Sequence, residues 1–204
     1  MKYTISTNFL DQDSPQQYDE GLFKLKAEED YIIARYLSLV GFNYSSHSLF
    51  HLQQCMEKYF KAFLIRSHDE RKFDTQHNLE KLAGWCSKYD YAFFNDKELL
   101  EACAVISPFA ELGRYQAKPP DEKHPESKKS AYSREIPASL NFFDEFVYEM
   151  RKKFPRRRPE ENIADAIKAL YDLSWHPFKG AISTPMLEAF KWENPYVSLI
   201  ESQF

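Results

Sequence analysis

An ordered row of polar side chains follows one face of the segment HLQQCMEKYFKAFL, residues 51–64. In a helix that turns about 100° per residue, His51, Gln54, Lys58 and Lys61 fall on the same side, and His47 lies one turn earlier. The opposite side carries the apolar residues Leu49, Leu52, Met56, Phe60 and Phe63. Two interpretations stay open: the row binds a polar ligand, or Glu57 and Lys61 form a solvated pair on an exposed face.

Metal binding is one chemistry that the row suggests. His47, His51 and Cys55 are spaced at i, i+4 and i+8, and residues at i and i+4 can share a metal on one helix face. His77 could supply another ligand in the fold. However, Cys55 lies about 80° around the helix from His47, and two helix histidines without a third convergent ligand are usually surface or interface residues. We therefore predict no metal and no cofactor.

Other catalytic patterns are missing from the sequence. The five glycines are scattered and form no phosphate-binding loop, and neither a Ser-His-Asp series nor a pair of carboxylates stands out. Any nucleotide would have to be bound by side chains and helix ends.

Composition indicates a soluble cytoplasmic protein. A chain of 204 residues with 43% hydrophobic residues can bury a sizeable core, and its formal net charge of -4 does not favour a polyanionic partner. Cys55, Cys86 and Cys103 are odd in number and far apart, which is typical of reduced buried thiols. No apolar run approaches the length of a membrane span.

The elements that must position the polar row are helices. Apolar residues recur at intervals of three and four, which indicates an all-α protein. Residues 1–24 have no clear period, and the first helix is expected at 27–40, with Glu28, Glu29 and Asp30 in its first turn. The second helix is expected from Ser45 or Ser46 to Ser67.

Three further helices follow in the expected order. The third starts with Thr75 or Asp74 as its cap and runs through NLEKLAGWCSKY. The fourth is capped by Asn95 and is disturbed at Pro108, and its continuation reaches FAELGRYQ. After a proline-rich loop at 116–132, a fifth helix presents the core residues Leu140, Phe143, Phe146, Val147 and Met150.

A domain boundary is expected at the basic segment RKKFPRRRP, which begins at residue 151. The sequence thus predicts an irregular lead-in at 1–24 and an antiparallel up-and-down bundle of four to five helices at 25–154. A helical or irregular C-terminal extension at 155–204 follows it.

Four stretches of this sequence carry a resemblance to the HEPN family. They are ARYL from Ala34, FHLQQCMEKYFKAFLI at 50–65, QHNLEKL at 76–82 and GRY at 113–115. HEPN domains are helical bundles that commonly dimerise, and many are encoded beside a minimal nucleotidyltransferase. The resemblance covers roughly residues 20–153.

The resemblance also implies a ligand site in a groove between helices or protomers. Its members would be Gln54, Glu57, Lys58, Lys61, His77, Arg114 and Tyr115. Lys58, Lys61 and Arg114 would donate charge-assisted hydrogen bonds to phosphate, and the Tyr115 ring would stack on a base.

Many members of the family are metal-independent ribonucleases that use an Arg followed, after four to six residues, by a His. Arg114 has no such histidine, and the spacing is met only by Arg71 and His77, before the third helix. We therefore expect a non-catalytic module, with Arg71 and His77 as reserve catalytic candidates. A toxin-like ribonuclease with an atypical site is the first alternative.

A second alternative is a scaffold protein that uses its C-terminal tail to bind a partner. A homodimer is expected because Tyr36, Phe50 and Tyr59 lie outside the main apolar stripes, unless the tail covers them. The expected partners are a second copy, a nucleotide and a nucleotidyltransferase protein, with no membrane.

Overall fold

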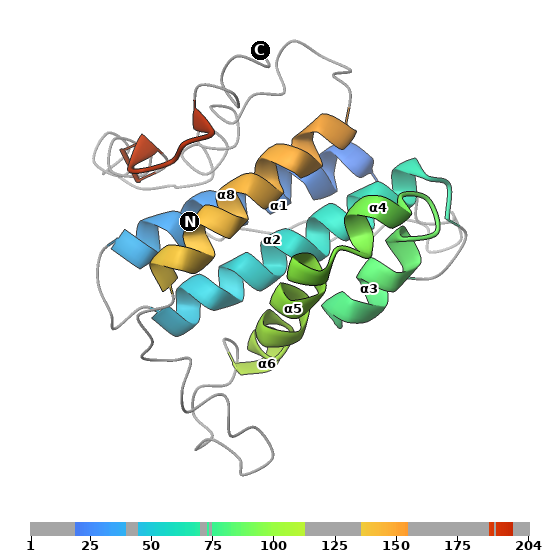
Figure 1. Ribbon diagram of the computed structural model, residues 1–204, viewed down its shortest axis with the longest axis horizontal. Helices are drawn as coiled ribbons and strands as arrows, with labels where there is room; N and C mark the ends of the chain where they lie inside the picture. The colour runs from blue at the N-terminus through green and yellow to red at the C-terminus, as the bar shows by residue number, and fades with distance from the viewer. Residues whose placement is uncertain are drawn as a thin grey trace, which may run out of the picture.

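The computed structural model describes residues 19–39, 45–69, 73, 75–112, 136–154, 188–189 and 191–197. Its described residues form helices and no strands, so the all-α class is confirmed. Figure 1 shows the long helices α1 (Glu20–Leu39), α2 (Ser45–Arg66) and α8 (Ile136–Lys153) lying roughly along one direction. The shorter α3 (Leu79–Cys86), α4 (Tyr91–Phe94), α5 (Lys97–Ile106) and α6 (Phe109–Leu112) pack beside α2.

Contacts between α1 and α2 define an antiparallel hairpin. Arg66 at the end of α2 meets Glu20 at the start of α1, with 3.4 Å between Nη1 and Oε1. At the other end, the hydroxyls of Ser38 and Ser48 lie 2.5 Å apart. Helix α8 is also antiparallel to α1, because Glu28 pairs with Arg151 and Arg35 with Asp144.

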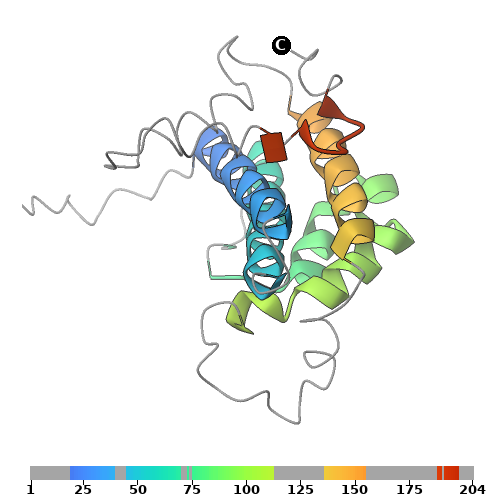
Figure 2. The ribbon, with the colours of Figure 1, turned by 90° about the vertical axis from the view of Figure 1, so that its left-hand side faces the viewer.

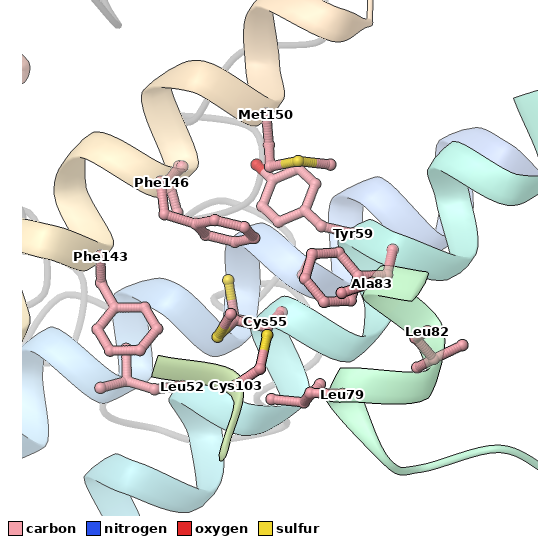
Figure 3. Packing of buried hydrophobic residues seen from close by; sticks show 14 of the residues in the cluster. Leu52, Cys55, Tyr59, Leu79, Leu82, Ala83, Cys103, Phe143, Phe146 and Met150 are labelled. Carbon is pink, nitrogen blue, oxygen red and sulfur yellow. The ribbon is translucent and has the colours of Figure 1, made fainter. Parts of the chain in front are cut away.

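Helix α2 is the central element of the bundle. Figure 3 shows its residues Leu52, Cys55 and Tyr59 surrounded by side chains from α3, α5 and α8. Leu52, Gln53, Cys55, Tyr59 and Ala62 are all fully buried, although they point in different directions around the helix. Neighbours therefore cover most of α2, including much of the side that carries the polar row.

Helix α1 begins at Glu20, so the predicted start at residue 27 is wrong. The Asp19 carboxylate accepts hydrogen bonds from the backbone N–H groups of Gly21 at 2.8 Å and Leu22 at 3.2 Å, which caps the helix. Glu28 and Asp30 are consequently in the middle of α1, where they pair with other helices instead of stabilising an N-terminus.

The caps of the shorter helices also differ from the prediction. Asn78 caps α3, because its Oδ1 accepts from Lys81 N at 2.9 Å; Thr75 does not, and Asp74 lies outside the described residues. Asp96 rather than Asn95 caps α5, with 3.0 Å from its Oδ1 to Leu99 N. The additional helix α4 is capped by Asp90.

The predicted boundary segment begins inside the core. Arg151 is 5% exposed and pairs with Glu28, while Lys153 pairs with Asp90 and lies 4.1 Å above the centre of the Phe93 ring. Residues 151–153 form the last turn of α8, where positive side chains are favoured by the helix dipole. Figure 2 shows residues 188–197 in red, near α1 and α8.

Candidate functional site

Glu57 is the centre of a buried polar cluster on α2. One carboxylate oxygen, Oε1, lies 2.8 Å from Lys61 Nζ and 3.0 Å from His77 Nδ1. The other oxygen accepts from Gln53 Nε2 at 2.9 Å. A buried carboxylate with this many partners is held in a single orientation, because each partner offsets part of its lost hydration.

His77 connects this cluster to the surface. The residue immediately precedes Asn78, the cap of α3, and its backbone carbonyl accepts from Gln53 Nε2 at 3.2 Å. Its side chain is 48% exposed, whereas that of Glu57 is 6% exposed. Since Nδ1 faces Glu57, an external ligand would meet the other ring nitrogen, Nε2.

A second cluster joins α1 to α2. The Asp30 carboxylate contacts His51, with 2.7 Å from Oδ1 to Nδ1, and also pairs with Lys58. The side chains of His51 and Lys58 are 24% and 25% exposed. This cluster therefore lies at the edge of the α1–α2 contact rather than in open solvent.

Gln54 lies beside Gln53 on α2, between the residues that form these two clusters. It is 8% exposed, and its Nε2 donates to the Gln53 side-chain oxygen at 2.6 Å. The sequence analysis does not include Gln53 among the site residues. It also does not predict that Asp30 of α1 contacts His51 and Lys58 of α2. The two adjacent glutamines, Gln53 and Gln54, are the sequence feature that could have indicated Gln53 as a site residue. A helical wheel does not include it, because Gln53 lies between the polar row and the apolar side.

The interpretation of the polar row as a solvated face is wrong. Glu57 and Lys61 do form the expected pair, but both are buried, at 4% and 3% exposure. Single-helix periodicity could not reveal this, because α1 and the residues before α3 cover the polar side of α2. The positive charges of Lys58 and Lys61 are each opposed by a carboxylate of the same chain.

The described residues bring together Gln54, Glu57, Lys58, Lys61 and His77 on or beside α2. The other predicted site residues, Arg71, Arg114 and Tyr115, lie outside the described part of the chain.

His51 and Cys55, which share a metal-like spacing with His47, have different surroundings. His51 contacts Asp30, whereas Cys55 is fully buried in the core. Burial, followed by the negative charge of Asp30, raises the pKa of Cys55 well above its ordinary value, which opposes a thiolate ligand. Within the described ranges, no three His, Cys, Asp or Glu side chains are grouped to hold a metal.

None of the helices in the described part of the chain is sufficiently long and apolar to span a membrane. The longest, α2, has 22 residues, and its sequence contains charged side chains that pair within the bundle.

Comparison with protein families identifies one domain. The family model described as "HEPN domain" matches residues 22–147, which comprise α1 through most of α8. Searches of curated proteins and of solved structures give no significant match.

Proposed function

The chain belongs to the HEPN domain family, and from this premise we propose that it is a non-catalytic nucleotide-binding module that acts as a homodimer. The observation that carries the proposal is the position of His77, which is half-exposed and held by the buried Glu57 cluster. The contact with Glu57 already restricts the rotation of the His77 side chain. His77 would therefore lose little conformational freedom when it contacts a ligand.

The bound group would be a nucleotide phosphate. The Arg114 guanidinium would donate to its oxygens, as would Nε2 of a doubly protonated His77 whose Nδ1 donates to Glu57, and the Tyr115 ring would stack on the base. Lys58, with a quarter of its side chain exposed, could turn from Asp30 towards an anion. The buried Gln54, Glu57 and Lys61 would act indirectly by orienting His77.

Thermal-shift measurements against purine and pyrimidine nucleotides provide the first test. A nucleotide that binds only the folded state must raise the apparent Tm in a concentration-dependent way. Calorimetric titration then compares wild type with His77→Asn, for which we expect a loss of about 1.5–3 kcal/mol, the value of a hydrogen bond to a charged group. This corresponds to a decrease in affinity of about tenfold or more.

His68→Asn is the matched control. His68 is exposed and has a φ of 53°, a conformation that asparagine tolerates well, so the same substitution is made without strain. Equal affinities for the His77→Asn and His68→Asn variants would refute the proposed site. If no nucleotide changes the Tm, the nucleotide-binding function itself is refuted.

A minimal nucleotidyltransferase is the proposed protein partner, on the basis of family membership alone. Co-elution of the two purified proteins in size-exclusion chromatography would support it. Separate elution at micromolar concentrations would oppose it.

A ribonuclease is the second candidate, because the contact between Glu57 and His77 resembles the carboxylate–histidine pairs that orient a general base. Arg71 would supply the positive charge for the phosphate. Our leading proposal predicts no cleavage of structured or unstructured RNA, with or without chelator. Chelator-resistant cleavage that is lost in the Arg71→Ala, His77→Ala double variant would establish the ribonuclease instead.

A further inference from the structure

Residues 188–189 and 191–197 belong to a short segment that lies beside α1 and α8. Its first residues make one helical turn, in which Trp192 N donates to Glu188 O at 2.8 Å. Ala189 and Asn194 are 4% and 8% exposed, whereas the Trp192 side chain is 59% exposed. The segment is therefore recognised mainly through its backbone and its small or polar side chains.

Arg35 of α1 provides most of that recognition. Its guanidinium pairs with Asp144 of α8 through Nη1, while Nε donates to the Ala189 carbonyl at 2.9 Å and Nη2 donates to the Trp192 carbonyl. Arg35 and Asp144 are 2% and 0% exposed in their side chains. Only the planar fork of an arginine could serve the carboxylate and both carbonyls together.

Tyr31 contributes a second polar contact beside Arg35. Its hydroxyl donates to the Asp144 carboxylate and accepts from Asn194 Nδ2 at 3.0 Å. Burial, followed by the charge of Asp144, raises the pKa of Tyr31 well above its ordinary value, so the hydroxyl keeps its proton. We call Tyr31, Arg35 and Asp144 the notch.

Apolar contact between the segment and the bundle comes mainly from Tyr196 and Val197, which pack against the core. The rings of Tyr196 and Tyr148 stack with centroids 5.1 Å apart, but a hollow of about 750 Å³ lies nearby, lined in part by Phe142, Glu145 and Lys191. The segment is thus attached by its polar contacts with the notch and by Tyr196 and Val197, which are partly buried against the core.

We propose that the notch is a peptide-docking site that is occupied by the chain's own residues 188–197 and that accepts the same segment from a second copy. Two features support this occupant. The notch already binds the carbonyls and the asparagine of this segment, and residues 155–187 separate the segment from α8. About 30 residues can span up to about 100 Å when extended, which is enough to reach a neighbouring molecule.

The tether decides which copy of the segment is bound. Tethering within one chain gives the segment an effective concentration on the order of millimolar, so the internal copy outcompetes an external one at micromolar concentrations. If the internal copy is removed, an external segment should bind about tenfold or more tightly than it does to wild type.

Ala189→Arg tests the internal contact in the full-length chain. It places a large cation at a buried position close to Arg35, so the segment should leave the notch. Glu188→Arg is the control, since residue 188 is exposed and receives the same side chain. Hydrogen exchange should show protected Trp192 and Asn194 amides in wild type and in the control, and at least tenfold faster exchange in Ala189→Arg.

The second copy is supplied as a fluorescent peptide of residues 186–199. Fluorescence anisotropy should show that the peptide binds Ala189→Arg at least tenfold more tightly than wild type or Glu188→Arg. A version of the peptide with Asn194→Ala should bind more weakly, because it cannot contact Tyr31.

The proposal is overturned if the peptide binds none of the three proteins, or binds all three with equal affinity. It is also overturned if Ala189→Arg leaves the amides protected. Far-UV circular dichroism checks that Ala189→Arg retains the helical bundle. Arg35→Lys offers an independent variant, because lysine keeps the charge opposite Asp144 but loses the fork, and it should release the segment in the same way.

Discussion

At the scale of single residues, the main feature is how many charged side chains are buried with a partner. On α1, Glu28, Asp30 and Arg35 are each less than a tenth exposed and each faces an opposite charge on another helix. Pairs of this kind add little net stability compared with apolar residues of the same shape. The loss of one member is nevertheless costly, because the other remains buried and uncompensated.

Glu57→Gln should therefore lower the free energy of unfolding by about 3–5 kcal/mol, because it removes the carboxylate opposite the buried Lys61. Urea denaturation followed by circular dichroism measures this change.

Glu101→Gln is the matched control for that substitution. Glu101 forms a pair with Lys97 at 3.6 Å, also at i and i+4, but the two side chains are 67% and 90% exposed. Its effect should not exceed about 1 kcal/mol. Similar losses for both variants would contradict the distinction between buried and solvated pairs.

At the scale of helices, α1, α3, α4 and α5 each start at a capping side chain. The sequence offers several candidate caps close together, such as Thr75 and Asn78 or Asn95 and Asp96, and propensity hardly separates them. The choice depends on tertiary packing. For α3, Leu79 is fully buried and its backbone N–H donates to Ser107 Oγ at 3.0 Å, which fixes the position of the first turn.

Asn78→Ala should destabilise the protein by about 1 kcal/mol, since it removes the acceptor for Lys81 N. Thr75→Ala should change the stability by less than about 0.5 kcal/mol, because Thr75 is exposed. Thermal denaturation of both variants tests the assignment. A larger loss of stability for Thr75→Ala than for Asn78→Ala would restore Thr75 as the cap.

The ion pair between the α4 cap Asp90 and Lys153 of α8 predicts that the stability of the fold depends on pH. Partial burial opposes ionisation of Asp90, but hydrogen bonds from Lys153 and Phe93 N, together with the Lys153 charge, lower its pKa below the ordinary value. A carboxylate with a lowered pKa stabilises the fold above the pKa of the unfolded chain, about 3.9, and this contribution disappears as the pH falls through the folded value.

Asp90→Asn retains a capping side chain but loses the charge. It should be less stable than wild type at pH 7 by up to about 1 kcal/mol, and the difference should close below about pH 4. Denaturation at a series of pH values checks this, and a difference that is independent of pH would exclude the ion pair as its cause.

The sequence predicts the helices well and the polar site only in part. The periodicity of the apolar residues and the composition are sufficient to predict the all-α class and the bounds of α2. They also predict the core residues of α8, namely Phe143, Phe146, Val147 and Met150. They could not place the partner of Lys58, because Asp30 comes from another helix. They place the Glu57–Lys61 pair but could not show that it is buried, because other parts of the chain cover that face of α2. Burial of Arg151 was missed for the same reason, since its partner Glu28 is 123 positions away.

At the scale of the whole molecule, the exposed apolar side chains indicate where two copies would associate. Tyr59, one of the aromatics expected at a dimer surface, is fully buried and donates to Glu28 at 3.2 Å, so its assignment to an exposed surface is wrong. Tyr36 and Phe50 are partly buried and stay candidates. Leu22 and Leu39 of α1 add exposed apolar surface, at 53% and 41%.

We expect light scattering at tens of micromolar to give a mass of twice the 24.2 kDa of the chain. Association through exposed apolar side chains of α1 gains free energy by removing them from water. A monomer in this concentration range would remove the homodimer from the proposed function but would leave the single-chain nucleotide site to be tested by titration.

The long-range pairs of α8 also determine when this helix joins the bundle during folding. Helices α1 and α2 are neighbours in sequence and can associate early, whereas the contacts of Asp144 and Arg151 with α1 close loops of 109 and 123 residues. Pulsed hydrogen exchange during refolding should therefore detect protection of the α2 amides before those of α8, and simultaneous protection would exclude this order.

For a chain emerging from the ribosome, the partners of Glu28 and Arg35 are synthesised more than a hundred residues later. Until then, the nascent α1–α2 hairpin must keep these two charges in water.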